Sequence, residues 1–227
     1  MHKFKWVLFD ADHTLFDFDK ASEEALSEVL AHHGVGWQTG MYADYKKINM
    51  ECWMEHEQGI MDRDTLVYER FKRYFDFMRL DLDPVSTQQV YLESLGSKPY
   101  MMPGADEILS WVKERSQLGY ITNGMSTVQR PRLELIGWHL KFDVIVIAGE
   151  IGCSKPHVNY FNFVHNQMGN PEKSEVLVVG DSLTADIGGA SAYGYMTCWY
   201  NPIGELCHQD VQPDYIISHL DELKTIV

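Results

Sequence analysis

Cysteine is scarce in this sequence. Four of the 227 residues are cysteines, they are widely spaced, and none belongs to a CxxC pair. A small disulfide scaffold is therefore excluded, and no HxxxH or HExxH pattern suggests zinc. The first residues, MHKFKWVLFDADHT, meet charged side chains too soon to form a signal-peptide core. We expect a reduced, cytoplasmic setting for the cysteines, which are Cys52, Cys153, Cys198 and Cys207.

Long apolar runs and basic clusters are also missing. No window approaches the ~20 apolar residues that a membrane-spanning helix needs, and the mean hydropathy is −0.26. Lys and Arg total 19 against 33 Asp and Glu, which gives a formal net charge of −14. Because no dense group of Lys and Arg offsets this charge, we expect neither nucleic acid nor a membrane surface as a partner.

The apolar residues are arranged as strands that alternate with helices. Hydrophobic residues make up 45% of the chain, with no internal repeat and no low-complexity segment. Short apolar runs predict strands at 4–9, 118–122, 142–148, 176–180, 196–199 and 215–217. Helical patterns occupy 105–115, 126–136, 157–168 and 184–193. This alternation predicts an α/β fold with a Rossmann-like, doubly wound parallel sheet.

One long interval interrupts the alternation. From about residue 17 to residue 96 the apolar and aromatic residues recur at helical spacing, and no strand pattern is present. We therefore predict a core made of residues 1–16 and 97–227 and an all-helical insertion over 17–96. The aromatic and Met stripes of the insertion are read first as helix packing and second as part of a ligand pocket.

Polar residues stand where predicted strands end, and in a parallel sheet that edge binds ligands. Asp10 and Asp12 follow the first strand, although a turn whose carboxylates bind backbone N–H groups explains them equally well. Thr122 and Asn123, with the free N–H groups of the next helix, form either a neutral anion cradle or an ordinary turn and cap. Lys155 precedes Pro156 and, alone, reads as a solvated side chain.

The fourth element is more specific. The apolar strand 176–180 ends in Gly180-Asp181, and Asp186 follows five residues later. Carboxylates at a strand end are suitable ligands for Mg²⁺, which prefers oxygen and keeps several waters.

Taken in order, these elements resemble the motifs of haloacid dehalogenase superfamily phosphatases, over essentially the whole chain and with the insertion in the place of a cap domain. The resemblance implies that Asp10 attacks phosphorus and that Asp12 is the general acid and base. It implies phosphate binding by Thr122 and Lys155, which we extend to Asn123. It further implies Mg²⁺ held by Asp10, Asp12 and Asp181, with Asp186 supporting the metal shell.

Other activities on this scaffold remain open. A haloacid dehalogenase proper is disfavoured because such enzymes resemble one another in lacking an acid two residues after the nucleophile, where Asp12 stands here. A phosphosugar mutase would share all the motifs. A catalytically dead binding module is disfavoured because every motif carboxylate is present.

Within the phosphatases, three stretches resemble the pyrimidine 5′-nucleotidase branch: 49–59, 180–187 and 197–201. The first makes Asn49 and Trp53 candidates for substrate contact, with a packing role for Trp53 equally compatible. We expect a small phosphomonoester substrate, by preference a nucleoside 5′-monophosphate. A sugar phosphate, phosphoglycolate or acylneuraminate phosphate is the alternative, and both a monomer and a homodimer remain open.

Overall fold

Within residues 3–207 and 211–227, which the computed structural model describes, six strands form one sheet. Their order across the sheet is β3-β2-β1-β4-β5-β6, and every neighbouring pair is parallel. The strands are β1 (Trp6–Asp10), β2 (Gln117–Thr122), β3 (Val144–Ile147), β4 (Val176–Gly180), β5 (Met196–Tyr200) and β6 (Tyr215–Ile217). The strand order reverses at β1, so the predicted doubly wound parallel sheet is confirmed.

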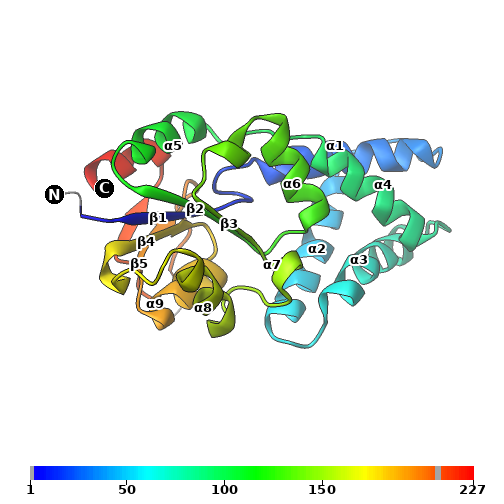
Figure 1. Ribbon diagram of the computed structural model, residues 1–227. Coiled ribbons are helices and arrows are strands. Elements are labelled where there is room, and N and C mark those ends of the chain that lie inside the picture. The colour runs from blue at the N-terminus through cyan, green and yellow to red at the C-terminus, as the bar shows by residue number, and fades with distance from the viewer. Residues whose placement is uncertain (1–2, 208–210) are drawn as a thin grey trace. The chain divides into compact units, whose positions relative to one another are not determined.

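Helices cover both faces of the sheet (Figure 1). One face carries α5 (Ala105–Lys113), α6 (Ser126–Leu135), η1 (Trp138–Leu140) and η4 (Leu220–Thr225). The other face packs against α7 (Ala148–Ile151), α8 (Val158–Gln167) and α9 (Gly189–Tyr193). Two short helical turns, η2 (Lys173–Glu175) and η3 (Leu183–Gly188), flank β4.

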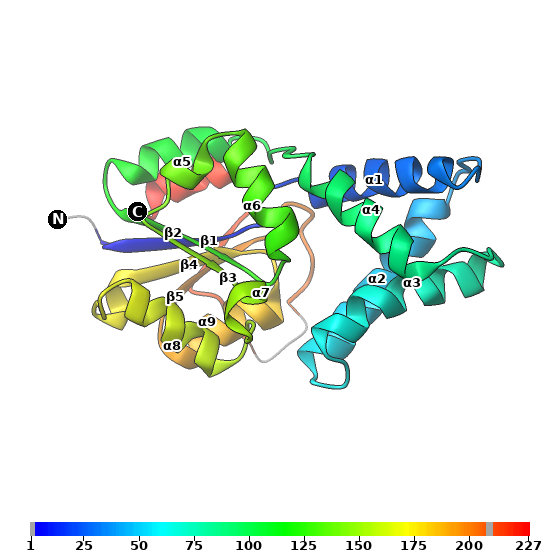
Figure 2. The same ribbon diagram turned by 45° about the vertical axis from the view of Figure 1, so that its right-hand side comes forward.

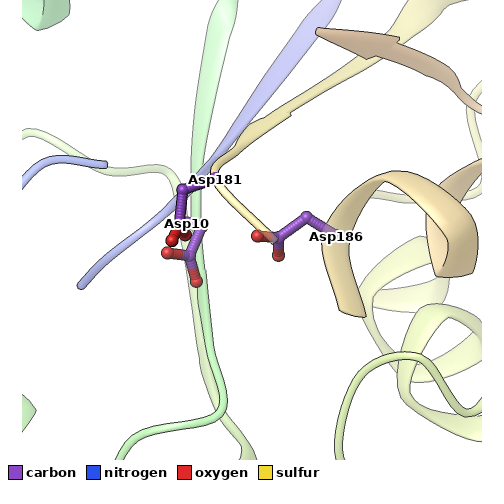
Figure 3. Close-up of side chains that lie close together, drawn as sticks. All are labelled: Asp10, Asp181 and Asp186. Carbon is purple, nitrogen blue, oxygen red and sulfur yellow. The ribbon is translucent and has the colours of Figure 1, made fainter. Parts of the chain in front are cut away.

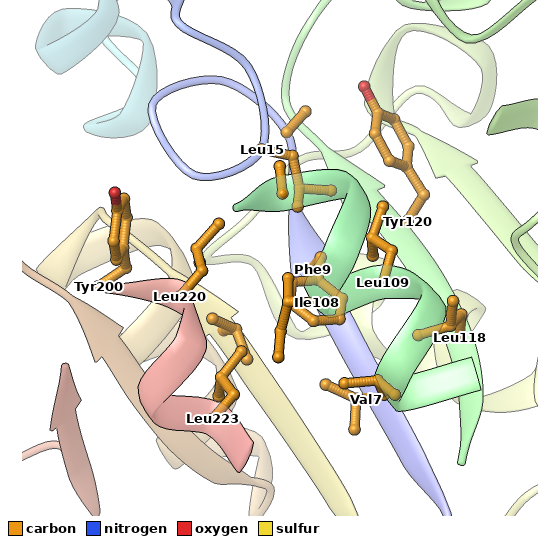
Figure 4. Packing of buried hydrophobic residues seen from close by; sticks show 14 of the residues in the cluster. Val7, Phe9, Leu15, Ile108, Leu109, Leu118, Tyr120, Tyr200, Leu220 and Leu223 are labelled. Carbon is orange, nitrogen blue, oxygen red and sulfur yellow. The ribbon is translucent and has the colours of Figure 1, made fainter. Parts of the chain in front are cut away.

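The buried residues of β1 show how one strand serves both layers. Successive side chains of a strand point to opposite faces. Val7 and Phe9 accordingly pack with Ile108 and Leu109 of α5 (Figure 4), whereas Trp6 and Leu8 belong to the cluster on the opposite face. A strand buried on both faces must be apolar along its whole length, as this one is until Asp10.

The inserted segment Asp19–Lys98 forms a second compact unit, which we call the helical unit, and the remainder is the core unit. Its helices are α1 (Phe18–His32), α2 (Met41–Glu57), α3 (Arg63–Met78) and α4 (Pro84–Gly96) (Figure 2). Aspartate side chains cap the N-termini of α3 and α4. Asp62 accepts from Thr65 N at 2.7 Å, and Asp83 accepts from Ser86 N at 2.9 Å. Such caps satisfy N–H groups that lack a partner within the helix.

Aromatic rings fill the interior of the helical unit. The ring of Tyr45 lies 5.4 Å from the rings of Phe71 and Tyr74 and 5.6 Å from that of Tyr91. The aromatic residues whose spacing predicted helices here therefore do pack between helices.

The chain leaves and re-enters the core unit through two segments that lie side by side. Asp17 N donates to Tyr100 O at 2.8 Å and Met102 N to Leu15 O at 2.9 Å, while Phe16 and Met101 form an antiparallel bridge. We call these segments, 15–17 and 100–102, the stem. No helix of the described ranges is long and apolar enough to cross a membrane.

Candidate active site

Asp10 ends β1, and the loop that follows it is tightly folded. Ala11 O accepts hydrogen bonds from Leu15 N at 2.9 Å and Phe16 N at 2.8 Å. His13 takes a left-handed conformation with φ of 66°, which closes the turn. Asp10 is buried at 8% exposure, so its carboxylate is removed from bulk water.

A second pair of carboxylates follows β4. Ser182 caps the π-helical turn η3 by accepting from Ala185 N at 3.0 Å, and Asp186 accepts from Ser182 N at 3.1 Å. The Asp186 carboxylate packs directly on Gly180, where an added Cβ would lie 2.3 Å from Asp186 Oδ2. Only glycine allows this approach, which turns Asp186 back toward the strand ends.

Asp10, Asp181 and Asp186 thus meet at the carboxyl edge of β1 and β4. One oxygen of each lies within 4.8 Å of the others, and the side chains converge in Figure 3. This is the point where the strand order reverses, which is the expected ligand position in an open parallel sheet. The sequence motifs had singled out all three residues.

Lys155 lies against this cluster. Its Nζ donates to Asp10 Oδ1 at 2.5 Å and Asp186 Oδ1 at 2.6 Å, and the side chain is 2% exposed. The Asn123 side chain fixes the Lys155 backbone in both directions, accepting from Lys155 N at 2.8 Å and donating to Lys155 O at 2.9 Å. The amide of Asn123 therefore positions Lys155, and its predicted contact with phosphate stays a prediction.

The charges of the cluster do not balance. Three carboxylates face one ammonium group, which leaves two negative charges when all four are ionised. Burial raises the pKa of Asp10 well above its usual value, although Lys155 acts in the opposite direction. Burial and the charge of Asp186 raise the pKa of Asp181 to about 8.

A divalent cation would relieve this strain. Buried carboxylates that repel one another retain protons, and a bound cation favours their ionised form instead. All the donors are hard oxygens, the ligand type that Mg²⁺ takes, and a charge of +2 would cancel the excess. The residues present therefore fit Mg²⁺.

Thr122 ends β2 beside this edge. The residue is 2% exposed, and its hydroxyl oxygen accepts from Gly124 N at 2.9 Å. The hydroxyl proton is not used in that bond and stays available as a donor. Phosphate binding by Thr122 stays a prediction.

The Asp12 carboxylate lies outside the three-carboxylate cluster. Its Oδ1 accepts from Arg132 Nη1 and its Oδ2 from Gln129 Nε2, both at 2.7 Å. Arg132 is fully buried, and Tyr120 OH donates to Gln129 Oε1. Asp186 lies beside Asp10 and Asp181, and its predicted role in supporting the metal shell stays a prediction. Metal ligation by Asp12 stays a prediction.

Sequence reasoning did not single out Gln129 and Arg132. The available signal was two polar residues three apart on the predicted helix 126–136, a spacing that places them on one face. The same pattern describes any solvated helix face, so only the fold shows that this face meets Asp12.

A family model for haloacid dehalogenase-like hydrolases matches residues 4–194. The chain belongs to this family. YjjG of Escherichia coli, a pyrimidine 5′-nucleotidase, is 32% identical over 225 residues, which cover 99% of this chain and 98% of that protein. PynA of Streptococcus pneumoniae, also a pyrimidine 5′-nucleotidase, is 33% identical over 222 residues, with coverages of 97% and 93%.

A solved structure resembles this haloacid dehalogenase-like hydrolase over nearly its full length. It is the magnesium-bound crystal structure of the HAD-hydrolase YfnB from Bacillus subtilis, with a TM-score of 0.94 and 32% sequence identity. The match covers 99% of this chain and 98% of that one.

The two residues of this hydrolase that are predicted to contact the substrate lie in α2 of the helical unit. Trp53 is half-buried, with its ring 5.8 Å from that of His56. Asn49 is 8% exposed, and its Oδ1 accepts from Arg70 Nη1 at 3.1 Å. Substrate contact by either residue stays a prediction.

Proposed function

We propose that this protein is a Mg²⁺-dependent phosphomonoester hydrolase that acts on nucleoside 5′-monophosphates, pyrimidine nucleotides first, through an aspartyl-phosphate on Asp10. The assignment of phosphatase activity rests on the cluster of Asp10, Asp181 and Asp186 beside Lys155 at the strand edge. Two relatives at 32% and 33% identity that are pyrimidine 5′-nucleotidases support the substrate class.

In the first step, a carboxylate oxygen of Asp10 attacks phosphorus, and the bond from phosphorus to the leaving oxygen breaks. Lys155 holds the attacking carboxylate and offsets the charge of the phosphate. When bound, Mg²⁺ supplies positive charge that lowers the repulsion between carboxylate and phosphate. Thr122 and Asn123 contribute donors to the phosphate oxygens.

Asp12 moves the protons. It donates one to the leaving oxygen, so the nucleoside departs as a neutral alcohol. In the second step the ionised Asp12 takes a proton from water as the water oxygen attacks phosphorus. Asp10 is released as a carboxylate and inorganic phosphate leaves. Division of the hydrolysis into two steps replaces one difficult displacement by two easier ones.

The helical unit supplies substrate selection in this proposal. The core motifs serve only the phosphate and the metal, so the groups that read the remainder of the substrate must come from elsewhere. Asn49 and Trp53 of α2 are the proposed contacts.

The test of the chemistry is Asp10→Asn, which keeps the shape of the side chain and removes the nucleophile. We expect turnover of p-nitrophenyl phosphate to fall roughly a thousandfold or more, with an unchanged circular dichroism spectrum. Turnover of the unaltered protein should disappear with EDTA and return with Mg²⁺. Near-normal turnover by Asp10→Asn would refute the mechanism.

The test of the substrate is a comparison of kcat/KM for UMP, AMP, ribose 5-phosphate, phosphoglycolate and an acylneuraminate phosphate. A lead for sugar phosphates of more than about tenfold, or ~1.4 kcal/mol of transition-state preference, would remove the nucleotidase assignment and leave the phosphatase.

A further inference from the structure

Arg70 in α3 is a buried cation that pairs with no carboxylate of residues 3–207 and 211–227. The residue is 3% exposed. Its Nη1 donates to Asn49 Oδ1 at 3.1 Å, and among the described residues its Nε and Nη2 have no hydrogen-bond partner. Buried donors that remain unpaired are costly, and a buried charge is costlier still.

The arginine one turn later shows what the same helix does with an ordinary cation. Arg73 donates from Nε to Glu69 at 3.1 Å and from Nη1 and Nη2 to Glu55 at 2.8 and 2.9 Å. That side chain is one-third exposed, yet all three nitrogens are paired. The helical unit therefore provides carboxylates to a partly solvated arginine and none to the buried one.

The aromatic neighbours of Arg70 do not take its N–H groups. The guanidinium carbon lies 5.1 Å from the ring centre of Tyr91 and 5.3 Å from that of Phe71. Contact with ring faces stabilises the charge of a guanidinium while its edge stays available. The rings and Asn49 thus hold the group in place.

The edge of the Arg70 guanidinium that carries Nε and Nη2 can bind only hydrogen-bond acceptors. Nε–H and the neighbouring N–H of Nη2 point the same way in the plane of the guanidinium, and together they match either two adjacent acceptor atoms or the two lone pairs of one carbonyl oxygen. Asn49 adds donors, because its oxygen already accepts from Arg70 and its amide nitrogen carries two N–H groups. A group recognised here must therefore present acceptors such as carbonyl oxygens.

We propose that Arg70, positioned by Asn49, binds the carbonyl edge of the base of the nucleotide substrate. This inference rests on the proposed nucleotidase function and names the residue that selects the base. Every pyrimidine base carries a carbonyl at position 2, whereas adenine carries none. Other side chains cover the guanidinium in this structure, so the base reaches it only when those side chains move.

The experiment compares kcat/KM for UMP with kcat/KM for ribose 5-phosphate, which lacks the base. Arg70→Met keeps an unbranched apolar side chain in the place of the arginine stem and removes the donors. We expect the ratio of UMP to ribose 5-phosphate to fall about 10- to 100-fold, as for loss of hydrogen bonds from a charged donor. The ratio of UMP to AMP should fall with it. Arg73→Met, one turn away, is the matched control and should leave both ratios unchanged.

Thermal unfolding separates recognition from folding. Because Arg70→Met removes an unpaired buried charge from an apolar interior, we expect its Tm to equal or exceed that of the unaltered protein. Asn49→Asp is a second test, since it gives Arg70 an internal carboxylate. It should raise Tm and lower the UMP to ribose 5-phosphate ratio.

Two outcomes would overturn the inference. One is a lower Tm of Arg70→Met with an unchanged substrate ratio, which would make Arg70 a structural residue. The other is an unchanged ratio in Asn49→Asp. Failure of the proposed function looks different, because the unaltered protein would then hydrolyse ribose 5-phosphate in preference to UMP.

Discussion

The partners of Asp10 and Asp12 differ, although a single residue separates them in the sequence. Asp10 shares Lys155 with Asp186 and lies beside Asp181, whereas Asp12 is bound by Arg132 and Gln129 of α6. A side chain held at both oxygens has one orientation, and general acid and base catalysis depends on such positioning. Arg132 is thus a positioning residue for the proposed proton transfers.

We expect Arg132→Met to lower kcat/KM for UMP, which covers only the first step, about 10- to 100-fold, with a smaller loss for p-nitrophenyl phosphate. The nucleoside oxygen needs a proton to leave, whereas nitrophenolate leaves with little help. The measurement is kcat and KM for both substrates. Arg130→Met is the matched control, because Arg130 lies in the same helix and forms a partly exposed ion pair with Glu150 at 2.8 Å. Equal losses of kcat/KM for both substrates would show that Arg132 has a structural role and does not position Asp12 for proton transfer to the leaving oxygen.

The residues of the strand-end cluster could be predicted from sequence because their positions follow from the sheet. Any residue that ends a parallel strand reaches the same edge, so Asp10 and Asp181 were expected together. Arg132, Gln129 and Arg70 could not be predicted in the same way. Their partners are distant in sequence, and a polar helix face shows no sign of what covers it.

Single elements were predictable where their apolar period was clear. All six strands match predicted runs to within about two residues. The helix predicted at 184–193 is in fact two pieces, the π-helical turn η3 and then α9. Within η3 the Asp186 side chain lies against Gly180, and apolar periodicity indicates neither this contact nor the π-helical turn.

Asp106 links two elements of the core unit. In the first turn of α5, it accepts from Trp138 Nε1 at 2.7 Å and Lys141 Nζ at 2.5 Å. The hydrogen bonds from Lys141 and Trp138 lower the pKa of Asp106 below its usual value of 3.8. Its contribution to stability is therefore present above the unfolded pKa and is lost as the pH falls through the folded pKa.

We expect Asp106→Asn to lower the free energy of unfolding at pH 7 and to weaken its decrease below about pH 4, the ordinary carboxyl range. Urea unfolding at pH 7 and pH 3 measures both. Glu107→Gln, an exposed neighbour in the same turn, is the control. An acid dependence identical to that of the unaltered protein would show that the Asp106 contacts do not contribute.

At the scale of the molecule, the core unit contains the whole three-carboxylate cluster, Lys155 and the pair that holds Asp12. The helical unit contains Asn49, Trp53 and Arg70. The division of the chain into a core and an all-helical insertion followed from the break in the strand and helix alternation. How each helix would begin was less evident, since Asp62 and Asp83 are recognisable as caps only once the helices are known.

We expect that replacing residues 19–98 by a linker of about four Gly and Ser residues leaves a folded core unit, because the stem already holds the two chain ends together. Circular dichroism and cooperative urea unfolding would test folding. The ratio of kcat/KM for UMP to that for ribose 5-phosphate should approach one. A chain that remains unfolded would show that the core needs the insertion.

The stem has an evolutionary consequence. A segment whose ends are held one hydrogen bond apart can be exchanged for any other segment with closely spaced ends, and the sheet beneath need not change. Descendants of one ancestral hydrolase could therefore acquire new specificities by grafting, while the reacting residues are inherited unaltered. In protein engineering, residues 17 and 100 are the natural points at which to join the insertion of one relative to the core unit of another.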